Sequence, residues 1–280
     1  MTSETTVVTV SYNSAAVLGG LLRSVGDADC VVVDNGGAQP LDAIVAESGA
    51  RLVRLERNEG FGRGCNAGAA LAQGKNLFFV NPDAQLAPGC ISALERAADS
   101  LPGFVAANPL IVDAQGRAHF RTGSILLSGS GGRGEAPAEP VGLPVLSGCA
   151  LFVRRAAFEA VGGFDPAIFL YHEDHDLALR LAALGKLWHV PEAVVRHVAG
   201  TAAPRTADVA WLKGYHMARS RHYVLRKHGR PLPLLRTVLP ALSGLILPHN
   251  LWSARRRSRV LGQVSGAFSS VGDHGEYSAP

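Results

Sequence analysis

The sequence predicts an α/β fold, with a mostly parallel central sheet covered by helices on both faces and a basic helical extension after it. Apolar, β-branched runs alternate with helical patterns along the first part of the 280-residue chain. This alternation is typical of parallel strands joined by crossover helices. With 47% hydrophobic and 18% charged residues, the chain has the composition of a globular protein and not of a disordered one.

The expected elements follow one another in a regular order. Strands are expected at residues 6–10, 30–33, 51–55, 76–80 and 146–153. Helices are expected at residues 13–25, 40–48, 66–72, 174–184 and 211–228. A glycine-rich turn is expected at residues 58–64, and a Gly/Pro-rich loop over the site at residues 128–142. Ligands of open parallel sheets bind outside the carboxyl ends of the strands, where Asp34, the 58–64 turn and Asp83 are expected.

The first residues and the cysteines indicate a cytoplasmic protein. The chain begins without a basic region or an apolar run, so we expect no secretory signal. The cysteines are scattered and lack the CxxC spacing of zinc or redox sites; they are Cys30, Cys65, Cys90 and Cys149. Buried thiols in a reducing compartment are the interpretation that this spacing favours.

Charge is distributed unevenly along the chain. Residues 205–259 contain twelve Lys or Arg and one acid, Asp208, whereas residues 1–204 contain 15 bases and 20 acids. We therefore expect two parts, a nucleotide-binding catalytic domain at 1–204 and a basic extension at 205–280. The extension is a candidate membrane-surface or acceptor-binding region, because a basic segment suits an anionic partner. Residues 232–251 are apolar but interrupted by prolines, which favours an interfacial hairpin or packed helix over a spanning helix.

The segment Asn81-Pro82-Asp83 follows the expected strand at residues 76–80. A carboxylate held at a strand end can bind a hard divalent cation, which in turn can neutralise a diphosphate. The same three residues are also favoured in ordinary turns. His197, at the end of an extended run, is likewise either a metal ligand or a structural residue.

Asp34 and Asn35 end the expected strand at residues 30–33. A carboxylate in this place can accept the imide N–H of uracil or thymine, and it would leave other bases with an unpaired buried group. A helix cap or an Asx-turn is the alternative interpretation.

A cluster of three acids and two histidines enters the expected helix at residues 174–184. Such clusters of titratable groups mark catalytic sites more often than surfaces. Asp176 lies four residues before Arg180, so we expect a structural i,i+4 ion pair there. Glu173 or Asp174, at the helix entrance, is then free to act as a general base.

Together these segments resemble the family 2 glycosyltransferases of the GT-A fold, and most of all the bacterial rhamnosyltransferase-like enzymes of cell-surface polysaccharide assembly. The matching stretches occur in the family's order within residues 6–200: 8–13, 32–36, 58–62, 66–68, 81–84, 147–150, 162–165, 173–177 and 191–197. Each stretch is weak by itself, but the ordered set is specific.

The resemblance implies a role for individual residues. Nucleotide-sugar binding is implied for Thr9, Ser11, Asn13, Asp34, Asn35, Arg63, Asn66, Asn81 and Asp83. Asp83 and His197 are implied as metal ligands, and Asp174 as the catalytic base, with Glu173 as the alternative. Contacts to the acceptor or donor sugar are implied for Ser147, Gly148, Asp165 and His172. Three residues depart from the family pattern: Asn81, which replaces an acid, Arg63 and Cys65.

The resemblance also implies an activity. We expect an inverting hexosyltransferase that needs Mg²⁺ or Mn²⁺ and moves rhamnose from dTDP-rhamnose to a saccharide or a polyprenyl-diphosphate-linked saccharide. A UDP-sugar donor and, less favoured, a sugar nucleotidyltransferase are the alternatives. We expect a cytoplasmic protein, peripheral at the anionic inner face of the plasma membrane. Nucleic acid is not an expected partner, because few aromatic residues stand among the basic ones.

Overall fold

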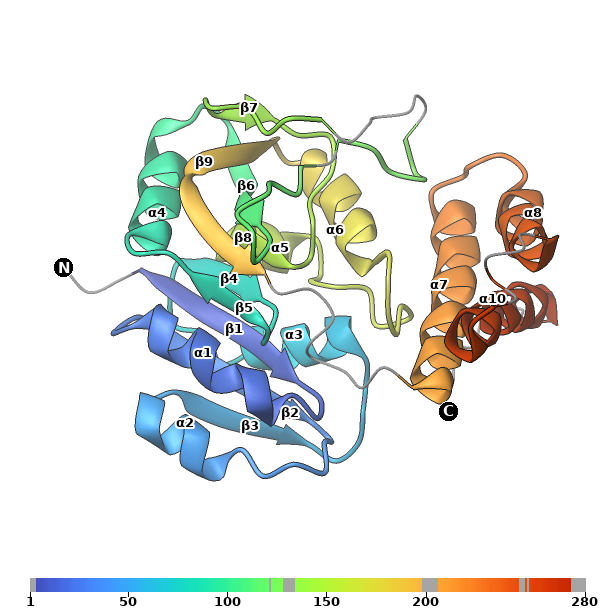
Figure 1. Ribbon diagram of the computed structural model, residues 1–280. Helices are drawn as coiled ribbons and strands as arrows, with labels where there is room; N and C mark the ends of the chain where they lie inside the picture. The colour runs from blue at the N-terminus through green and yellow to red at the C-terminus, as the bar shows by residue number, and fades with distance from the viewer. Residues whose placement is uncertain are drawn as a thin grey trace. The chain divides into compact units, whose positions relative to one another are not determined.

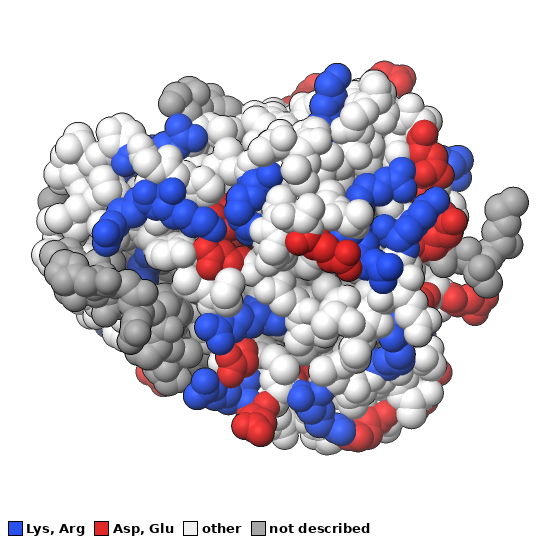
Figure 2. Space-filling model, turned by 180° about the vertical axis from the view of Figure 1, so that it is seen from behind, with Lys and Arg blue, Asp and Glu red and all other residues white. Residues whose placement is uncertain are grey.

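The computed structural model describes residues 4–120, 122–127, 134–197, 206–246, 250 and 252–272. The chain divides into two compact units (Figure 1). The first unit comprises Met1–Ser124, Gly129–Asp165 and Asp174–Ala202, and the second comprises Ile125–Ser128, Pro166–Glu173 and Ala203–Pro280. Acidic and basic side chains are interspersed over much of the face shown in Figure 2.

The first unit is built on one nine-stranded sheet with the order β3-β2-β1-β4-β8-β6-β9-β5, and β7 pairs with β9. Its strands are β1 (Thr5–Ser11), β2 (Asp29–Asn35), β3 (Arg51–Leu55), β4 (Asn76–Val80), β5 (Ala84–Leu86), β6 (Phe104–Val112), β7 (Val141–Gly142), β8 (Ala150–Arg154) and β9 (Lys186–His197). Strands β3, β2, β1 and β4 are parallel. Beyond β4 the directions are mixed, since β8 is antiparallel to β4 and β6, whereas β9 is parallel to β6. The predicted α/β fold is confirmed.

Helices cover both faces of this sheet (Figure 1). They are α1 (Ala15–Val25), α2 (Asp42–Ser48), α3 (Phe61–Ala69), α4 (Cys90–Ser100), α5 (Arg155–Ala160) and α6 (Glu173–Ala182). One apolar cluster joins α1, α2 and α4 to strand residues such as Val7 and Phe78. A second joins α3, α5 and α6 to their neighbours Val8 and Phe79. Because successive strand residues point to opposite faces, these runs are apolar without interruption.

The glycine-rich segment at residues 58–64, which we expected to be a turn, contains the start of a helix. Helix α3 begins at Phe61, so the helix predicted at residues 66–72 starts too late. A Cβ at Gly64 would lie 2.8 Å from Val10 Cγ1, and one at Gly68 would lie 2.4 Å from Val8 Cγ1. The glycines are therefore needed for the close approach of α3 to β1, which local sequence patterns do not reveal.

Two further expected elements, the strand at residues 146–153 and the loop at residues 128–142, need correction or lie partly outside the described residues. The strand predicted at residues 146–153 begins only at Ala150, because the side chain of Asn108 takes the hydrogen bonds of the Ser147 backbone. Part of the loop predicted at residues 128–142, residues 128–133, lies outside the described residues. The described end of that loop forms β7 against β9.

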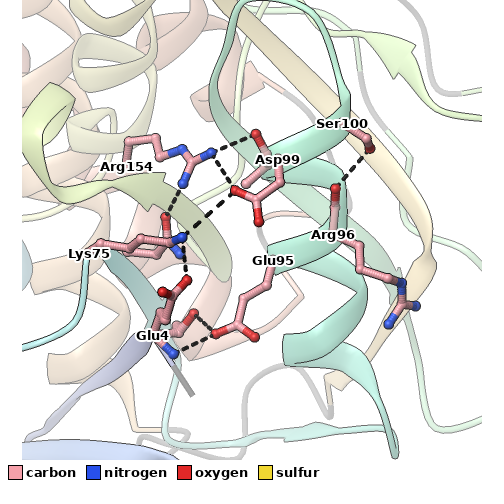
Figure 3. A network of polar contacts seen from close by, with 10 residues as sticks. Glu4, Lys75, Glu95, Arg96, Asp99, Ser100 and Arg154 are labelled. Atoms are coloured by element: carbon pink, nitrogen blue, oxygen red, sulfur yellow. Dashed lines mark hydrogen bonds and ion pairs between the residues drawn. The ribbon is translucent and has the colours of Figure 1, made fainter. Parts of the chain in front are cut away.

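A network of charged side chains joins α4 to the sheet at the end opposite the carboxyl ends of β1 and β4 (Figure 3). Lys75 pairs with Glu4 and lies 3.9 Å from Asp99, which also contacts Arg154 at 3.0 Å. Glu95 accepts a hydrogen bond from the backbone N–H of Glu4. Exposed pairs of this kind each contribute little to stability. The position of α4 is set by its buried apolar face, and the network lies at the end of the sheet opposite the candidate site.

The second unit is helical (Figure 1). It contains α7 (Ala207–Lys227), α8 (Pro233–Ile246) and α10 (Ala254–Gly272). The basic helix expected at residues 211–228 is present as α7. Pro240, which we expected to interrupt the apolar run, lies inside α8, and the sequence did not predict α10. In the part of the chain that the structure describes, no helix has the length and hydropathy needed to cross a membrane.

Helices α7 and α10 pack through glycines. A Cβ at Gly214 would lie 2.1 Å from the backbone oxygen of Arg259, and Cβ atoms at Gly262 and Gly266 would lie equally close to the backbone of α7. The two helices thus approach backbone to backbone, as in small-xxx-small helix pairs. This contact places the arginines at the start of α10 on a rigid element.

We predict that Gly68→Ala lowers the free energy of unfolding by about 1–3 kcal/mol, because the added methyl collides with Val8 inside a packed core. Gly19→Ala in α1 is the matched control, since its Cβ would meet the flexible end of Arg23 at 3.3 Å and Ile44 Cγ2 at an ordinary contact distance of 3.9 Å. The control should be neutral or stabilising by up to about 1 kcal/mol. Urea unfolding followed by circular dichroism measures both, and equal stabilities would contradict the packing argument.

Candidate active site

The side chains of Asp83 and His197 meet at one edge of the sheet. Asp83 directly precedes β5, and β5 pairs with the end of β9 in a register that sets Ala84 opposite His197. Asp83 Oδ1 lies 3.1 Å from His197 Nε2, and both side chains are largely buried. The two residues that the sequence singled out separately are therefore neighbours.

The Asp83–His197 pair has the chemistry and the spacing of two ligands of one cation. In an octahedral shell with bonds near 2.1 Å, adjacent ligand atoms are about 3 Å apart. The observed 3.1 Å fits this spacing. Among the described residues, no group of three or more His, Cys, Asp or Glu could hold a metal ion. A cation here would therefore take its other ligands from substrate oxygens and water, as magnesium commonly does.

Asp34 lies at the carboxyl end of β2, beside a hollow of about 360 Å³. Its Oδ1 accepts a hydrogen bond from the Gly37 backbone N–H at 3.0 Å, and its Oδ2 is 3.9 Å from Arg54 Nε. Gly37 and Arg54 also line the hollow. The carboxylate is thus oriented by one N–H and keeps acceptor capacity for a ligand.

Three of the other residues expected to bind the nucleotide are placed near the end of β1. Asn13 has a positive φ of 53°, and its Oδ1 accepts from the Ala38 backbone N–H at 2.8 Å. Ser11 shares a hydrogen bond of 2.8 Å with Ser14. Thr9 is fully buried, and its hydroxyl has no hydrogen-bond partner among the described residues. The structure thus leaves Thr9 no surface with which to contact a base.

Two amides that we expected at the nucleotide are hydrogen-bonded to neighbouring loops. Asn35 Nδ2 donates to Asn58 Oδ1 and to the Gly60 oxygen, and its Oδ1 accepts from the Glu59 N–H. Asn66 bonds both the N–H and the C=O of Phe164, at 2.9 and 2.8 Å. Both side chains are thereby engaged with the backbone.

Arg63 lies in the first turns of α3. Its guanidinium is 3.1 Å from Glu59 Oε2, and its side chain is partly exposed. It therefore remains available at the surface, beside the loop that Asn35 holds.

A backbone hydrogen bond between Asn81 and Cys149 links the segment of Asp83 to the segment that contacts Asp174. The backbone N–H of Asn81 donates to the Cys149 oxygen at 2.9 Å. Burial, and then the negative charges of Asp83 and Asp174, raise the pKa of the Cys149 thiol. Asp174 accepts the N–H of Gly148, the residue before Cys149, and Asp83 lies two residues after Asn81. The structure thus brings Asp83 and Asp174 to the same region.

Asp174, in the first turn of α6, is held by backbone N–H groups. Its Oδ2 accepts from Gly148 at 2.9 Å, and its Oδ1 accepts from His175 at 2.8 Å. A Cβ at Gly148 would lie 3.2 Å from the Asp174 Cβ, so glycine permits this contact. The next acid behaves differently, since Asp176 is fully buried and pairs with Arg180 at 2.7 Å, as predicted.

A cavity of about 460 Å³ lies beside Asp174. This volume falls in the range of small-molecule sites. Its lining includes Asn108, Phe120, Ser147, Asp174, His175 and His189. Nε2 of His189 is buried without a hydrogen-bond partner among the described residues, and burial lowers the pKa of this imidazole. The cavity therefore offers a ligand the carboxylate of Asp174, whereas His189, only 2% exposed, forms part of the wall.

Asn108 and His189 are functional candidates that the sequence did not suggest. Asn108 donates to the Ser147 and Ala150 oxygens and accepts from the Ser147 N–H, and so it shapes the segment before β8. His189 is an apparently ordinary residue of β9 that contacts the Phe120 ring, with centroids 5.0 Å apart. Only the fold, which pairs β6 with β9, reveals that both line one cavity.

The remaining expected residues lie near the boundaries of the two units. Asp165, half-buried, ends a segment of the first unit, whereas His172 and Glu173 belong to the second. His172 has a positive φ of 67°, and Glu173 is buried. Of the two acids considered as the base, Asp174 is therefore the one that lines the cavity of the first unit.

Comparisons with known proteins identify the family to which the chain belongs. The sequence model of the family described as Glycosyl transferase family 2 matches residues 6–162. Two relatives, from Mycobacterium tuberculosis strains CDC 1551 / Oshkosh and ATCC 25618 / H37Rv, are each called N-acetylglucosaminyl-diphospho-decaprenol L-rhamnosyltransferase. Each is 31% identical over 305 residues, which cover 93% of this chain and 98% of the relative.

Solved glycosyltransferases show the same fold at lower identity. GalNAc-T7 with UDP, GalNAc and Mn²⁺ has a TM-score of 0.58 and 21% identity, over 69% of this chain and 43% of that one. The mannosyltransferase PcManGT from Pyrobaculum calidifontis, in complex with GDP-Man and Mn²⁺, has a TM-score of 0.57 and 16% identity, over 99% and 77%. S. aureus TarS 1–349 with UDP-GlcNAc has a TM-score of 0.57 and 15% identity, over 97% and 91%. With the family match and the similarity along the whole chain, they establish that this protein is a glycosyltransferase of family 2 with the GT-A fold.

Proposed function

We propose that the protein transfers L-rhamnose from dTDP-rhamnose to a polyprenyl-diphosphate-linked N-acetylglucosamine, with inversion at the anomeric carbon and with a divalent cation. The observation that carries the proposal is the similarity, along nearly the whole chain, to a rhamnosyltransferase whose name specifies this acceptor type. The Asp83–His197 pair and the cavity beside Asp174 supply the chemistry that such a transfer requires.

The donor nucleotide is proposed to lie along the carboxyl ends of β1, β2 and β4. Asp34 accepts the imide N–H of the thymine base and Asn13 flanks the ribose, while Ser11, only 1% exposed, supports this end of β1 from below through Ser14. Uracil carries the same imide, so Asp34 does not discriminate between dTDP- and UDP-sugars. A UDP-sugar donor is therefore the alternative. A sugar nucleotidyltransferase is disfavoured, because the family match is to transferases of sugars.

Asp83 and His197 are proposed to hold Mg²⁺ or Mn²⁺. When bound, the cation neutralises the charge that develops on the departing nucleoside diphosphate. Asn81 is uncharged, so its amide contributes hydrogen bonds and no ligand charge. Asp83, largely buried and hydrogen-bonded to His197, is thereby held at the position where the diphosphate is expected.

Asp174 is proposed to remove the proton from the attacking acceptor hydroxyl. Each of its oxygens already accepts one backbone N–H, which fixes the plane of the carboxylate. A carboxylate oxygen has two lone pairs, so acceptor capacity remains for the hydroxyl. The acceptor sugar is proposed to occupy the cavity beside Asp174, where Ser147 forms part of the wall and Gly148 holds the Asp174 carboxylate.

The donor is tested by incubating the purified protein and Mn²⁺ with a lipid-diphosphate-linked N-acetylglucosamine and each of dTDP-rhamnose, UDP-sugars and GDP-sugars. We expect a rhamnosylated product from dTDP-rhamnose, identified by mass spectrometry. Transfer from a UDP-sugar alone would replace the proposed donor by the alternative. Release of pyrophosphate from a nucleoside triphosphate and a sugar phosphate would contradict the reaction class.

We expect Asp83→Ala to weaken Mn²⁺-dependent binding of dTDP, because one of the two protein ligands is lost. EDTA should weaken dTDP binding to the native protein and leave the variant unchanged. Isothermal titration calorimetry of dTDP binding measures the effect of the substitution and the effect of EDTA, and it does not require sugar transfer. Asp27→Ala, at an exposed aspartate, is the matched control. If EDTA had no effect on dTDP binding by the native protein, Asp83 and His197 would lose their proposed role.

We expect Asp174→Asn to lower kcat by about 10²–10⁴-fold, the usual cost of losing a positioned general base. Binding of dTDP should be retained, because Asp174 is not proposed to contact the nucleotide. Glu173→Gln is the comparison that separates the two candidate bases. If Glu173→Gln lost turnover while Asp174→Asn kept it, the role of base would pass to Glu173.

A further inference from the structure

Helix α8 exposes an apolar face that most helices of globular proteins bury. Five of its leucines are 37–55% exposed: Leu234, Leu235, Leu239, Leu242 and Leu245. At 3.6 residues per turn these leucines lie within one arc of about 140°, and Val238, within the same arc, is partly buried against Ala218, Ala241 and Ala267. The opposite face, with Thr237, Ala241 and Gly244, is the one buried within the second unit.

Apolar exposure continues at the start of α10. Trp252, which precedes this helix, is 87% exposed. On α10 itself Leu261 and Phe268 are 54% and 55% exposed, and their spacing of seven residues puts them on one face. Tryptophan and leucine side chains exposed together are typical of surfaces that meet the boundary of a lipid bilayer.

The same region is strongly basic. Arg255, Arg256 and Arg257 are exposed in the first turn of α10, and residues 209–272 contain no acid. Positive charge at a helix N-terminus is opposed by the helix dipole. Negatively charged lipid headgroups attract exposed arginines of this kind, and they also suit the positive end of the helix dipole.

We propose that the second unit docks on an anionic lipid bilayer through this region. The docking surface consists of the five exposed leucines of α8, Trp252 and Arg255–Arg257 of α10. The leucines and Trp252 enter the boundary between headgroups and acyl chains, and the arginines contact lipid phosphates. The mode is interfacial, since α8 has 14 residues and contains Pro240, and no described helix is able to span a membrane.

A second copy of this chain fits the surface less well. A two-fold dimer would pair the same patch on both subunits, and so it would bring arginines together without any acid from residues 209–272 to offset them. Bilayer docking does not depend on the proposed reaction, because it needs neither donor nor acceptor.

The test is flotation of the full chain with vesicles of phosphatidylcholine alone and of phosphatidylcholine with phosphatidylglycerol. We expect binding to the anionic vesicles that falls with added salt, and little binding to the neutral ones. The variant Leu235→Ser, Leu239→Ser, Leu242→Ser should bind at least about tenfold more weakly, because buried apolar area is lost. Leu71→Ser, Leu184→Ser is its matched control, at leucines of similar exposure in the first unit.

The double variant Arg255→Gln, Arg257→Gln should lose about fivefold in affinity per arginine, and therefore about 25-fold. Arg23→Gln, Arg96→Gln, which removes two exposed arginines of the first unit, should bind as the native chain does. Circular dichroism of every variant establishes that the helices are retained.

Two results would overturn the proposal. The first is no binding to phosphatidylglycerol vesicles at low salt, or binding that the leucine and arginine variants leave unchanged. The second is a native dimer, seen by sedimentation, that the leucine variant converts to a monomer while vesicle binding stays the same. In that case the exposed leucines face a second copy of the chain.

Discussion

The candidate site depends on the pairing of β5 with β9. Strand β5 has three residues, Ala84–Leu86, and it pairs antiparallel with the end of the last strand of the first unit. This pairing brings together Asp83 and His197, which are 114 residues apart in the chain. Strand β9 also pairs with β6 and carries His189 into the cavity beside Asp174. The site is therefore complete only when β9 has joined the sheet.

The parallel half of the fold could be predicted from the sequence, because its signals are local. β-branched runs, helix periodicity and polar residues at strand ends sufficed for β1 to β4 and for the position of Asp34 and Asp83. The mixed half could not be derived in this way. Pairing of β8, β5 and β9 joins residues far apart in the chain, and no local pattern records their directions. The sequence did not predict the correct start of α3. A glycine-rich segment that forms a turn cannot be told, from its sequence alone, from one that packs a helix closely against a strand.

The asparagines show a related limit. The resemblance implied ligand contacts for Asn35 and Asn66, whereas in the structure their amides hold the loop before α3 and the segment at Phe164. Asn108, which the sequence did not suggest, has the same function before β8. An amide offers both donors and an acceptor, so it can replace the hydrogen bonds of an irregular backbone segment. The fold decides whether the amide of an asparagine near the site binds a ligand or the backbone of a loop.

The environment of the cysteines has a practical consequence for labelling. Cys30, Cys65 and Cys90 are buried, and burial raises the pKa of Cys30 and Cys90 to about 12. Cys149 is held in its protonated form by burial and by the two neighbouring carboxylates. The thiolate is the reactive form, so the native thiols react slowly at neutral pH. A cysteine introduced on the exposed face of α8 would be the first to react, and a single fluorophore could be attached there without removing any native residue of the core.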